Sequence, residues 1–307
     1  MALILPLLAA IPIVMIAREI GRRVIEARHA RRFTFDESGI IAGASGIDAV
    51  APGSVGVLLL HGFGDTPQAF SAIASALQSK GFAVRAPLLP GHGRTIPEFA
   101  RTDAAAWLDE AARAYDDMAR RHDRVVIIGL SMGAAIGAIL AGGRPPTLAA
   151  FIALAPYIVV APRVRRLARH RWLIHALAPW LPAADARSIR DDAARAVSLG
   201  YGMVSAPLLH ELASIADRAR QALRQIAAPT LVIMSRDDNR VDAAAVERAL
   251  ADLGAPEQRV VWLKGSGHVI TVDHERARVL DEIQGWLERW TVESRAAAAE
   301  TSDGGNR

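Results

Sequence analysis

Residues 125–142, which read VVIIGLSMGAAIGAILAG, decide the fold of this chain. The opening run VVIIGL has no polar break and predicts a strand covered on both faces, and the small apolar residues after Ser131 predict a buried helix. Between them lies Gly129-Leu130-Ser131-Met132-Gly133, which matches the pattern G-x-S-x-G. A sharp strand-to-helix turn of this kind holds a serine hydroxyl above the carboxyl edge of a sheet, at the positive end of a helix dipole. The stretch therefore predicts a nucleophilic serine.

Short apolar runs alternate with helical segments on both sides of this turn. This alternation predicts an α/β fold with a mostly parallel, doubly wound sheet. The alternation lapses between residues 157 and 225, where Pro-bounded helical pieces predict a helical cap inserted into a core of residues 33–156 and 226–290. Residues 33–50 are expected to add one or two leading strands. Further strands are expected at 55–60, 82–89, 148–154, 230–235 and 259–263, and helices at 67–79, 103–121, 242–253 and from about 273 to 290.

The two ends of the chain differ from this core. Residues 2–17 carry no charge, and six arginines follow by residue 32, so the charge lies on the wrong side for a secretory signal. We expect segment 1–32 to be a membrane anchor or interfacial helix, with the catalytic domain in the cytoplasm. The alternative is a helix docked on a soluble cytoplasmic protein. Residues 291–307 are polar and rich in small residues, and we expect a disordered tail there.

Composition excludes several functions. The chain of 307 residues has no cysteine, which rules out disulfides, thiolate catalysis and Cys-based metal sites. Its formal net charge of +4 comes mostly from arginines spread along the sequence, and no nucleic-acid-binding module is present. Its histidines and carboxylates show no metal-ligand spacing, so we expect no metal site. Nothing in the sequence indicates an oligomeric state.

A serine nucleophile needs a base, and the base needs an acid to orient it. In this type of fold the three follow in the order Ser, Asp or Glu, His. His268 lies in GSGH directly after the strand at 259–263, and Asp237 and Asp238 follow the strand at 230–235. Loops after parallel strands meet at one edge of the sheet, so Ser131, His268 and one of the two aspartates are expected to converge.

Acyl transfer also needs donors for the oxyanion. Two backbone amides usually supply them, one from the residue after the nucleophile and one from an earlier strand–helix loop. The sequence His61-Gly62-Phe63-Gly64 forms that earlier loop, so the amides of Phe63 and Met132 are the expected donors. His61 itself is expected to order the loop through hydrogen bonds.

The whole pattern resembles the bacterial carboxylesterase and monoacylglycerol-lipase group of the α/β-hydrolase superfamily. The resemblance covers roughly residues 55–290 and rests on LLLHGFGDTPQAF, LLPGHGRT, GLSMGAAIGA, SRDDNRVD and GSGHVITVDHER. It implies Asp238 as the triad acid, an eight-stranded core, a small helical cap, an acyl-enzyme mechanism and no cofactor. The apolar amino-terminal segment has no counterpart in the soluble members of that group.

We therefore expect a serine hydrolase of carboxylic esters, of carboxylesterase or monoacylglycerol/lysolipid-lipase type, acting on small-molecule or lipid esters. Two alternatives remain: an amide or peptide hydrolase with the same triad, and a membrane-tethered protein of this fold without activity. The arginines at 163, 165, 166, 169 and 171 suggest that the cap docks on anionic lipid. Four large apolar residues of the cap are expected to line an acyl pocket or to form the cap's own core: Trp172, Leu173, Leu177 and Trp180.

Overall fold

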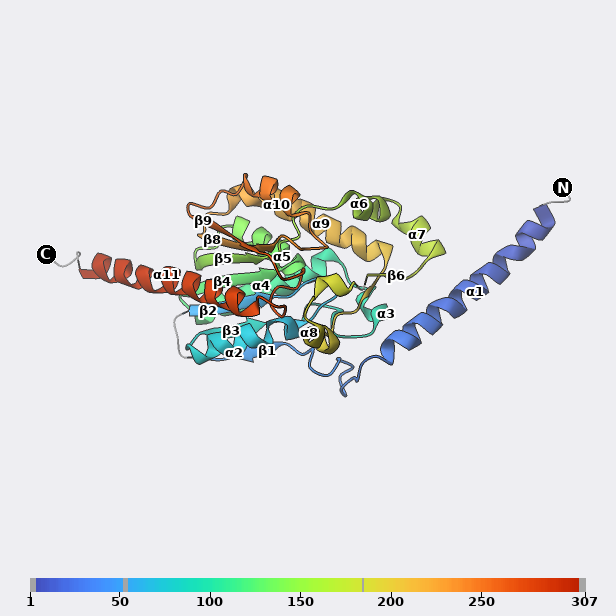
Figure 1. Ribbon diagram of the computed structural model, residues 1–307, viewed down its shortest axis with the longest axis horizontal. Coiled ribbons are helices and arrows are strands. Elements are labelled where there is room, and N and C mark those ends of the chain that lie inside the picture. Colours follow the sequence, from blue (N-terminus) through green and yellow to red (C-terminus); the bar gives the residue numbers. More distant parts are fainter. Residues whose placement is uncertain (1–3, 52–54, 184, 304–307) are drawn as a thin grey trace.

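A twisted sheet with helices on both faces forms the body of the protein (Figure 1). The computed structural model describes residues 4–51, 55–183 and 185–303, with side chains described for residue 12 and from residue 14 to 290 within those ranges. The sheet has seven strands in the order β1-β3-β2-β4-β5-β8-β9, and only the edge strand β1 runs antiparallel to its neighbour. The predicted α/β fold is thereby confirmed. The strands are β1 (Ile47–Ala49), β2 (Val55–Leu60), β3 (Ala83–Ala86), β4 (Arg124–Leu130), β5 (Leu148–Leu154), β8 (Thr230–Ser235) and β9 (Gln258–Leu263).

Each face of the sheet has its own apolar core because successive side chains of a strand point to opposite faces. Leu58 and Ile127 belong to one core, and their neighbours Leu59 and Ile128 belong to the other. Central strands β2 and β8 are buried at every position, as parallel strands between two helical layers must be. The first core is covered by α4 (Ala104–Arg121), α5 (Met132–Gly142), α9 (Ala206–Ala222) and α10 (Ala243–Leu250), and the second by α2 (Ser71–Ser79) and α11 (Arg276–Asp303).

The order of the strands indicates the edge of the sheet at which a ligand would bind. The order in which the chain adds strands to the sheet reverses at β2, because β3 is added on one side of β2 and β4 on the other. Ligands of open α/β sheets bind outside the carboxyl ends of the strands at such a reversal. The loop after β2 and the turn after β4 both leave the sheet there. The loops after β8 and β9 leave the same edge, since both strands run parallel to β4 and β5.

Between β5 and β8 the chain forms the cap. It contains α6 (Pro162–Arg169), α7 (Arg171–Leu177), the short ribbon β6 (Leu181–Pro182) and β7 (Met203–Val204), a 3-10 turn η2 (Ala186–Ser188) and α8 (Asp192–Val197). Our cap boundary at residue 225 is too late. Leu208, Ile215 and Ala216 of α9 are buried in the first core, so α9 is a layer of the core and supports the cap from below.

The two ends of the core agree only in part with the sequence-based expectations. Residues 33–50 supply one leading strand, β1, which is within the one or two expected. The resemblance implied eight strands, whereas the described residues form a sheet of seven. Residues 33–45 make only an isolated bridge between Phe35 and Ile41, because the Asp36 carboxylate accepts the N–H groups of Ser38 and Ile40 and folds a tight turn instead. At the other end, the backbone of residues 291–303 continues helix α11. The run AAAAE favours this because alanine has the highest helix propensity and no glycine or proline interrupts it.

Helix α1 (Ile4–Ala30) leaves the body at the end opposite to the C-terminal end of α11 (Figure 1). Its last turns dock on the cap region. The buried His29 donates from Nε2 to the Tyr201 carbonyl oxygen at 2.8 Å, and Glu26 accepts from Trp180 Nε1 at 3.0 Å. Among the described residues, no helix has the length and apolar character that a bilayer crossing requires. The predicted anchor at residues 2–17 lies largely outside the residues with described side chains.

His29 is the buried side chain among the contacts that hold α1 to the rest of the chain, so its removal should lower the stability of the fold. We expect His29→Ala to lower the free energy of unfolding by about 1–3 kcal/mol, because a buried hydrogen bond and the imidazole contacts with Phe33 and Tyr201 are lost, although Arg32 still donates to the Tyr201 carbonyl oxygen. Urea unfolding at neutral pH measures this. The neighbouring exposed Arg28→Ala is the control and should remain within about 0.5 kcal/mol of the wild type. Equal stabilities of the two variants would contradict the docking.

Candidate active site

Ser131 sits in a strained turn between β4 and α5. Its backbone has φ 55° and ψ −112°, a left-handed conformation that non-glycine residues rarely adopt. Close packing imposes this conformation. A Cβ at Gly133 would lie 1.9 Å from the Leu60 carbonyl oxygen, and one at Gly129 would lie 2.3 Å from the Gly133 oxygen. The two glycines of the G-x-S-x-G motif are therefore required by the contact of α5 with the ends of β2 and β4.

The structure brings Ser131, His268 and Asp238 together in one hydrogen-bonded chain. His268 Nδ1 lies 2.7 Å from Asp238 Oδ2, and His268 Nε2 lies 2.8 Å from Ser131 Oγ. A carboxylate only accepts, so Nδ1 carries the ring proton and Nε2 is free to accept from the serine hydroxyl. The three side chains come from the loops after β4, β8 and β9, as the sequence predicted.

Asp238 is held as an anion. Burial raises its pKa, but the charge of His268, the hydrogen bond from that ring and the N–H groups of Arg240 and Val241 outweigh burial, and the pKa lies below its usual value. The neighbouring Asp237 points elsewhere, into an exposed ion pair with Arg190. The structure thus distinguishes the two aspartates that the sequence order alone left open.

The loop after β2 reaches the same place. Gly62 lies beside the nucleophile, since a Cβ there would be 3.5 Å from the Ser131 Cβ. The Phe63 ring is fixed against Phe99 and Trp107, with ring centroids 5.2 and 5.8 Å away. Within the described residues, the N–H groups of Phe63 and Met132 donate to no protein acceptor, so both remain available to a ligand.

His61 orders this loop, as expected. The Leu89 N–H donates to its Nε2 at 3.1 Å, so its Nδ1 carries the proton and donates to the Gly62 carbonyl oxygen at 2.9 Å. Burial lowers the pKa of His61 to about 4, only partly opposed by the bond to Gly62. The ring is therefore neutral at physiological pH and serves as a bridge between two loops.

Sequence reasoning missed two carboxylates near the site. Asp65 lies on the Phe63 loop, where burial raises its pKa to about 6 against the opposing effects of the Thr66 N–H and the charge of His268. Asp273 lies five residues after His268 and is fully buried. The sequence gives it little signal, because it is one of several charged residues at the start of the last helix. Within the described residues, no group of histidines and carboxylates is arranged to hold a metal ion.

The cap covers the site closely. Ser131 is 7% exposed and His268 8% exposed. Trp180 is buried in the first core of the sheet, whereas Trp172, Leu173 and Leu177 are 63–76% exposed. For these three residues both of our expectations, pocket and core, were wrong. Helix α7 has only seven residues, and its packing against α9 leaves its other side in solvent.

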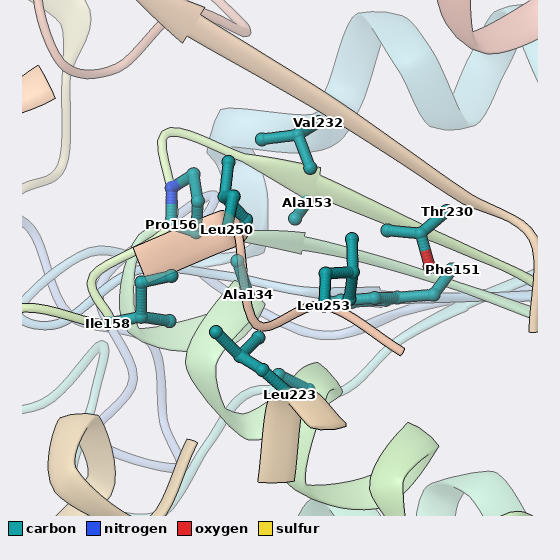
Figure 2. A pocket seen from close by; sticks show the side chains of 11 residues that line it. Ala134, Phe151, Ala153, Pro156, Ile158, Leu223, Thr230, Val232, Leu250 and Leu253 are labelled. Carbon is teal, nitrogen blue, oxygen red and sulfur yellow. The ribbon is translucent and has the colours of Figure 1, made fainter. Parts of the chain in front are cut away.

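An apolar cavity lies elsewhere in the core, under β5 and β8 (Figure 2). Phe151, Val232 and Leu223 are among the side chains that line it. Its volume of about 10 Å³ corresponds to roughly one water molecule. None of the three groups Ser131, His268 and Asp238 lines it, so this space is a packing gap and not an acyl pocket.

Comparison with known proteins agrees with the geometry. The chain is 26% identical over 229 residues to a thermostable monoacylglycerol lipase of Bacillus sp. (strain H-257), covering 75% of this chain and 88% of the relative. It is 24% identical over 243 residues to a carboxylesterase of Bacillus subtilis (strain 168), covering 77% and 94%. A solved structure from a study of the metagenome-derived lipolytic enzymes LipS and LipT superposes with a TM-score of 0.74 at 27% identity, covering 81% of this chain and 99% of that one.

These similarities confirm the resemblance that the sequence motifs indicated. The solved structure of a monoacylglycerol lipase from Paleococcus ferrophilus shares the fold with a TM-score of 0.68 at 19% identity over 79% of this chain and 97% of that one. A family model described as "serine aminopeptidase, S33" matches residues 54–275, which include Ser131, Asp238 and His268. The chain therefore belongs to this S33 family of α/β-hydrolases.

Proposed function

We propose that the protein is a serine hydrolase that cleaves carboxylic esters through an acyl-enzyme on Ser131. One observation carries the proposal: the unbroken hydrogen-bonded chain from Ser131 Oγ through His268 to Asp238. A serine hydroxyl alone is a weak nucleophile, and a base within hydrogen-bond reach activates it. The relatives named as monoacylglycerol lipase and carboxylesterase support an ester over an amide as the substrate.

In the acylation step, Ser131 Oγ attacks the carbonyl carbon of the ester while its proton passes to His268 Nε2. The ring then carries a positive charge, which the Asp238 anion stabilises through Nδ1–H. When the tetrahedral intermediate collapses, the bond to the alcohol oxygen breaks and His268 gives that oxygen the proton. In deacylation, water replaces the alcohol: His268 removes its proton, the hydroxide attacks the acyl carbon, and Ser131 Oγ leaves with the proton returned.

The negative oxygen of both intermediates needs preorganised donors. We assign them to the N–H groups of Met132 and Phe63. Met132 is the first residue of α5, so the helix dipole adds to its N–H. Phe63 is held by its ring contacts and by the His61 bridge on the preceding residues. Both amides lack a protein acceptor in the described part of the chain, which supports the assignment.

We further propose that the enzyme acts at the surface of an anionic membrane, on the cytoplasmic side, and hydrolyses lipid-derived esters there. Exposed apolar side chains occur on two adjacent helices: Val14, Met15 and Ile16 on α1, and Trp172, Leu173 and Leu177 on α7. The helices are linked because Arg18 donates to the carbonyl oxygens of His175 and Ala176. Exposed apolar clusters of this kind mark interaction surfaces.

Charge favours a lipid partner for this surface. Arg163, Arg166 and Arg169 on the neighbouring helix α6 are exposed, and among the described residues no carboxylate forms an ion pair with them, unlike Arg165, which pairs with Asp217. Arginines beside tryptophan and leucine fit the headgroup region of an anionic bilayer. We call this surface, formed by α1, α6 and α7, the basic-apolar surface.

The triad proposal predicts a graded set of losses. With p-nitrophenyl esters from acetate to palmitate, Ser131→Ala should abolish turnover. Asp238→Asn should reduce kcat by about 10⁴-fold, because an amide cannot hold the required tautomer of His268. Asp237→Asn is the matched control and should stay within a few-fold, since its exposed ion pair contributes little. Hydrolysis of aminoacyl p-nitroanilides with no hydrolysis of any ester would overturn the ester assignment in favour of an amide hydrolase.

The His61 bridge predicts acid sensitivity. The folded state lowers the pKa of His61 to about 4 from about 6.5 in the unfolded chain, so folding favours the neutral ring. This contribution is fully present above pH 6.5 and is lost as pH falls through 4; it amounts to about 3 kcal/mol. Urea unfolding between pH 7 and 4 should therefore show a shallower pH dependence for His61→Gln than for the wild type. Parallel curves would contradict the buried neutral bridge.

The membrane proposal predicts a charge-dependent affinity for vesicles. Replacing Arg163, Arg166 and Arg169 with glutamine should weaken sedimentation with phosphatidylglycerol vesicles by about two orders of magnitude, at about 1 kcal/mol for each arginine. The control is a triple glutamine variant at Arg113, Arg120 and Arg248 on α4 and α10, which removes the same charge elsewhere. Equal effects of the two triple variants, or no binding by the wild type, would count against the basic-apolar surface.

A further inference from the structure

The catalytic loop of His268 runs directly beneath one segment of the cap. Residues 185–191, which we call the strap, lie over it. A Cβ on Gly267 would come within 2.1 Å of the Arg187 carbonyl oxygen and 2.8 Å of the Ser188 carbonyl oxygen. The backbone of the His268 loop and that of the strap are therefore in direct contact, with no space for even a methyl group between them.

The strap also touches the loop of the triad acid. Ser188 Oγ accepts from Arg240 Nε at 2.8 Å and donates to Asn239 Oδ1 at 3.2 Å. The Ser188 carbonyl oxygen accepts the N–H of Val269 at 2.9 Å. One cap residue thus bonds to the loops of both Asp238 and His268.

Asp273 makes the second connection between strap and catalytic loop. Its carboxylate is fully buried and accepts four backbone N–H groups. Oδ2 accepts from Gly267 at 2.7 Å and from Arg190 at 2.9 Å. Oδ1 accepts from Asp191 at 2.8 Å and from His274 at 2.9 Å. Burial raises its pKa, but these N–H groups more than compensate, and the pKa lies below its usual value.

These hydrogen bonds hold the backbone on both sides of His268. Its two neighbours, Gly267 and Val269, each donate their N–H to a fixed acceptor, Asp273 on one side and the strap carbonyl of Ser188 on the other. The backbone on both sides of the histidine is therefore held. The strap itself is held by Asp273 through the N–H groups of Arg190 and Asp191. Among the described residues, no arginine, lysine or histidine side chain bonds to this carboxylate. Its negative charge is therefore stabilised by backbone N–H groups.

We propose that Asp273 is a positioning residue for His268, and that it does so by locking the cap strap onto the catalytic loop. This inference rests on the proposed ester hydrolysis. Asp273 does not touch substrate. It sets the position of the imidazole between Ser131 and Asp238, and it makes that position depend on a seated strap. Displacement of a reacting group by about 1 Å costs about 10²-fold in rate, which is the effect expected when the lock is lost.

The test is Asp273→Asn in the full-length protein, because the amide has the same shape but presents an NH₂ group to two of the four donors. We expect kcat for p-nitrophenyl butyrate to fall about 10²-fold with KM changed less than three-fold. The matched control is Glu275→Gln. Glu275 accepts the N–H groups of Lys264 and Gly265 at the start of the same loop and does not bond to the strap. Its loss should lower the melting temperature with kcat within a few-fold.

A second pair of variants isolates the strap without altering the buried carboxylate. Asp191 has φ −67°, which suits a proline ring. Asp191→Pro removes the N–H that reaches Asp273, whereas Asp191→Ala removes only the side chain and keeps that N–H. We expect kcat of the proline variant to be about ten-fold below that of the alanine variant. Equal values would overturn the role of the strap, even if Asp273→Asn fails to fold.

A fluorophosphonate probe separates this proposal from the parent one. The probe labels an activated serine without any ester substrate. If wild-type Ser131 is not labelled and no ester is hydrolysed, the proposed function fails. If the wild type is labelled and Asp273→Asn is labelled at the same rate, the positioning role of Asp273 fails while the proposed function stands. Slower labelling of Asp273→Asn, with Glu275→Gln close to wild type, is the result that we expect.

Discussion

The close contact of helix α5 with the end of strand β2 is the constraint on which the active site depends. Two glycines, Gly129 and Gly133, allow backbone to pass backbone at a distance that no side chain would permit. The turn between them holds Ser131 in a left-handed conformation that costs about 1–3 kcal/mol. The buried strands and helices around the turn hold it there. The rigid core thus fixes the position of the Ser131 hydroxyl group, and the other groups of the site lie around it.

Much of this was readable in the sequence because it follows from local rules. The apolar runs before Ser131, Asp238 and His268 identify parallel strands, and parallel strands bring their following loops to one edge. The spacing of the motif, together with this edge, was sufficient to bring the three residues together. The choice of Asp238 over Asp237 needed either a family pattern or coordinates, because it depends on which of two adjacent carboxylates points inward.

Other features could not be read because they are set by distant contacts. Only the end of the segment 33–50 forms a strand, because a turn stabilised by Asp36 leaves an isolated bridge between Phe35 and Ile41 in its first part. The exposure of Trp172 and Leu177 depends on how much of the short helix α7 is covered by α9. The spacing of apolar residues along the sequence does not reveal this. Asp273 appears in the sequence as one more charged residue at a helix start. Its four backbone partners come from segments about 80 residues apart in the chain, and only the fold brings them together.

Tyr201 connects the amino-terminal helix α1 to the loop after β2. Its carbonyl oxygen accepts from His29 of α1, its N–H donates to the Gly64 carbonyl oxygen beside the proposed oxyanion donor, and its hydroxyl group bonds to Gly91 and Arg94. Helix α1 is thereby a structural neighbour of the loop that carries Phe63. Chimeras that exchange caps or amino-terminal segments among these hydrolases must therefore carry Tyr201, the strap and their acceptors as one unit, since each fixes part of the site that the other pieces need.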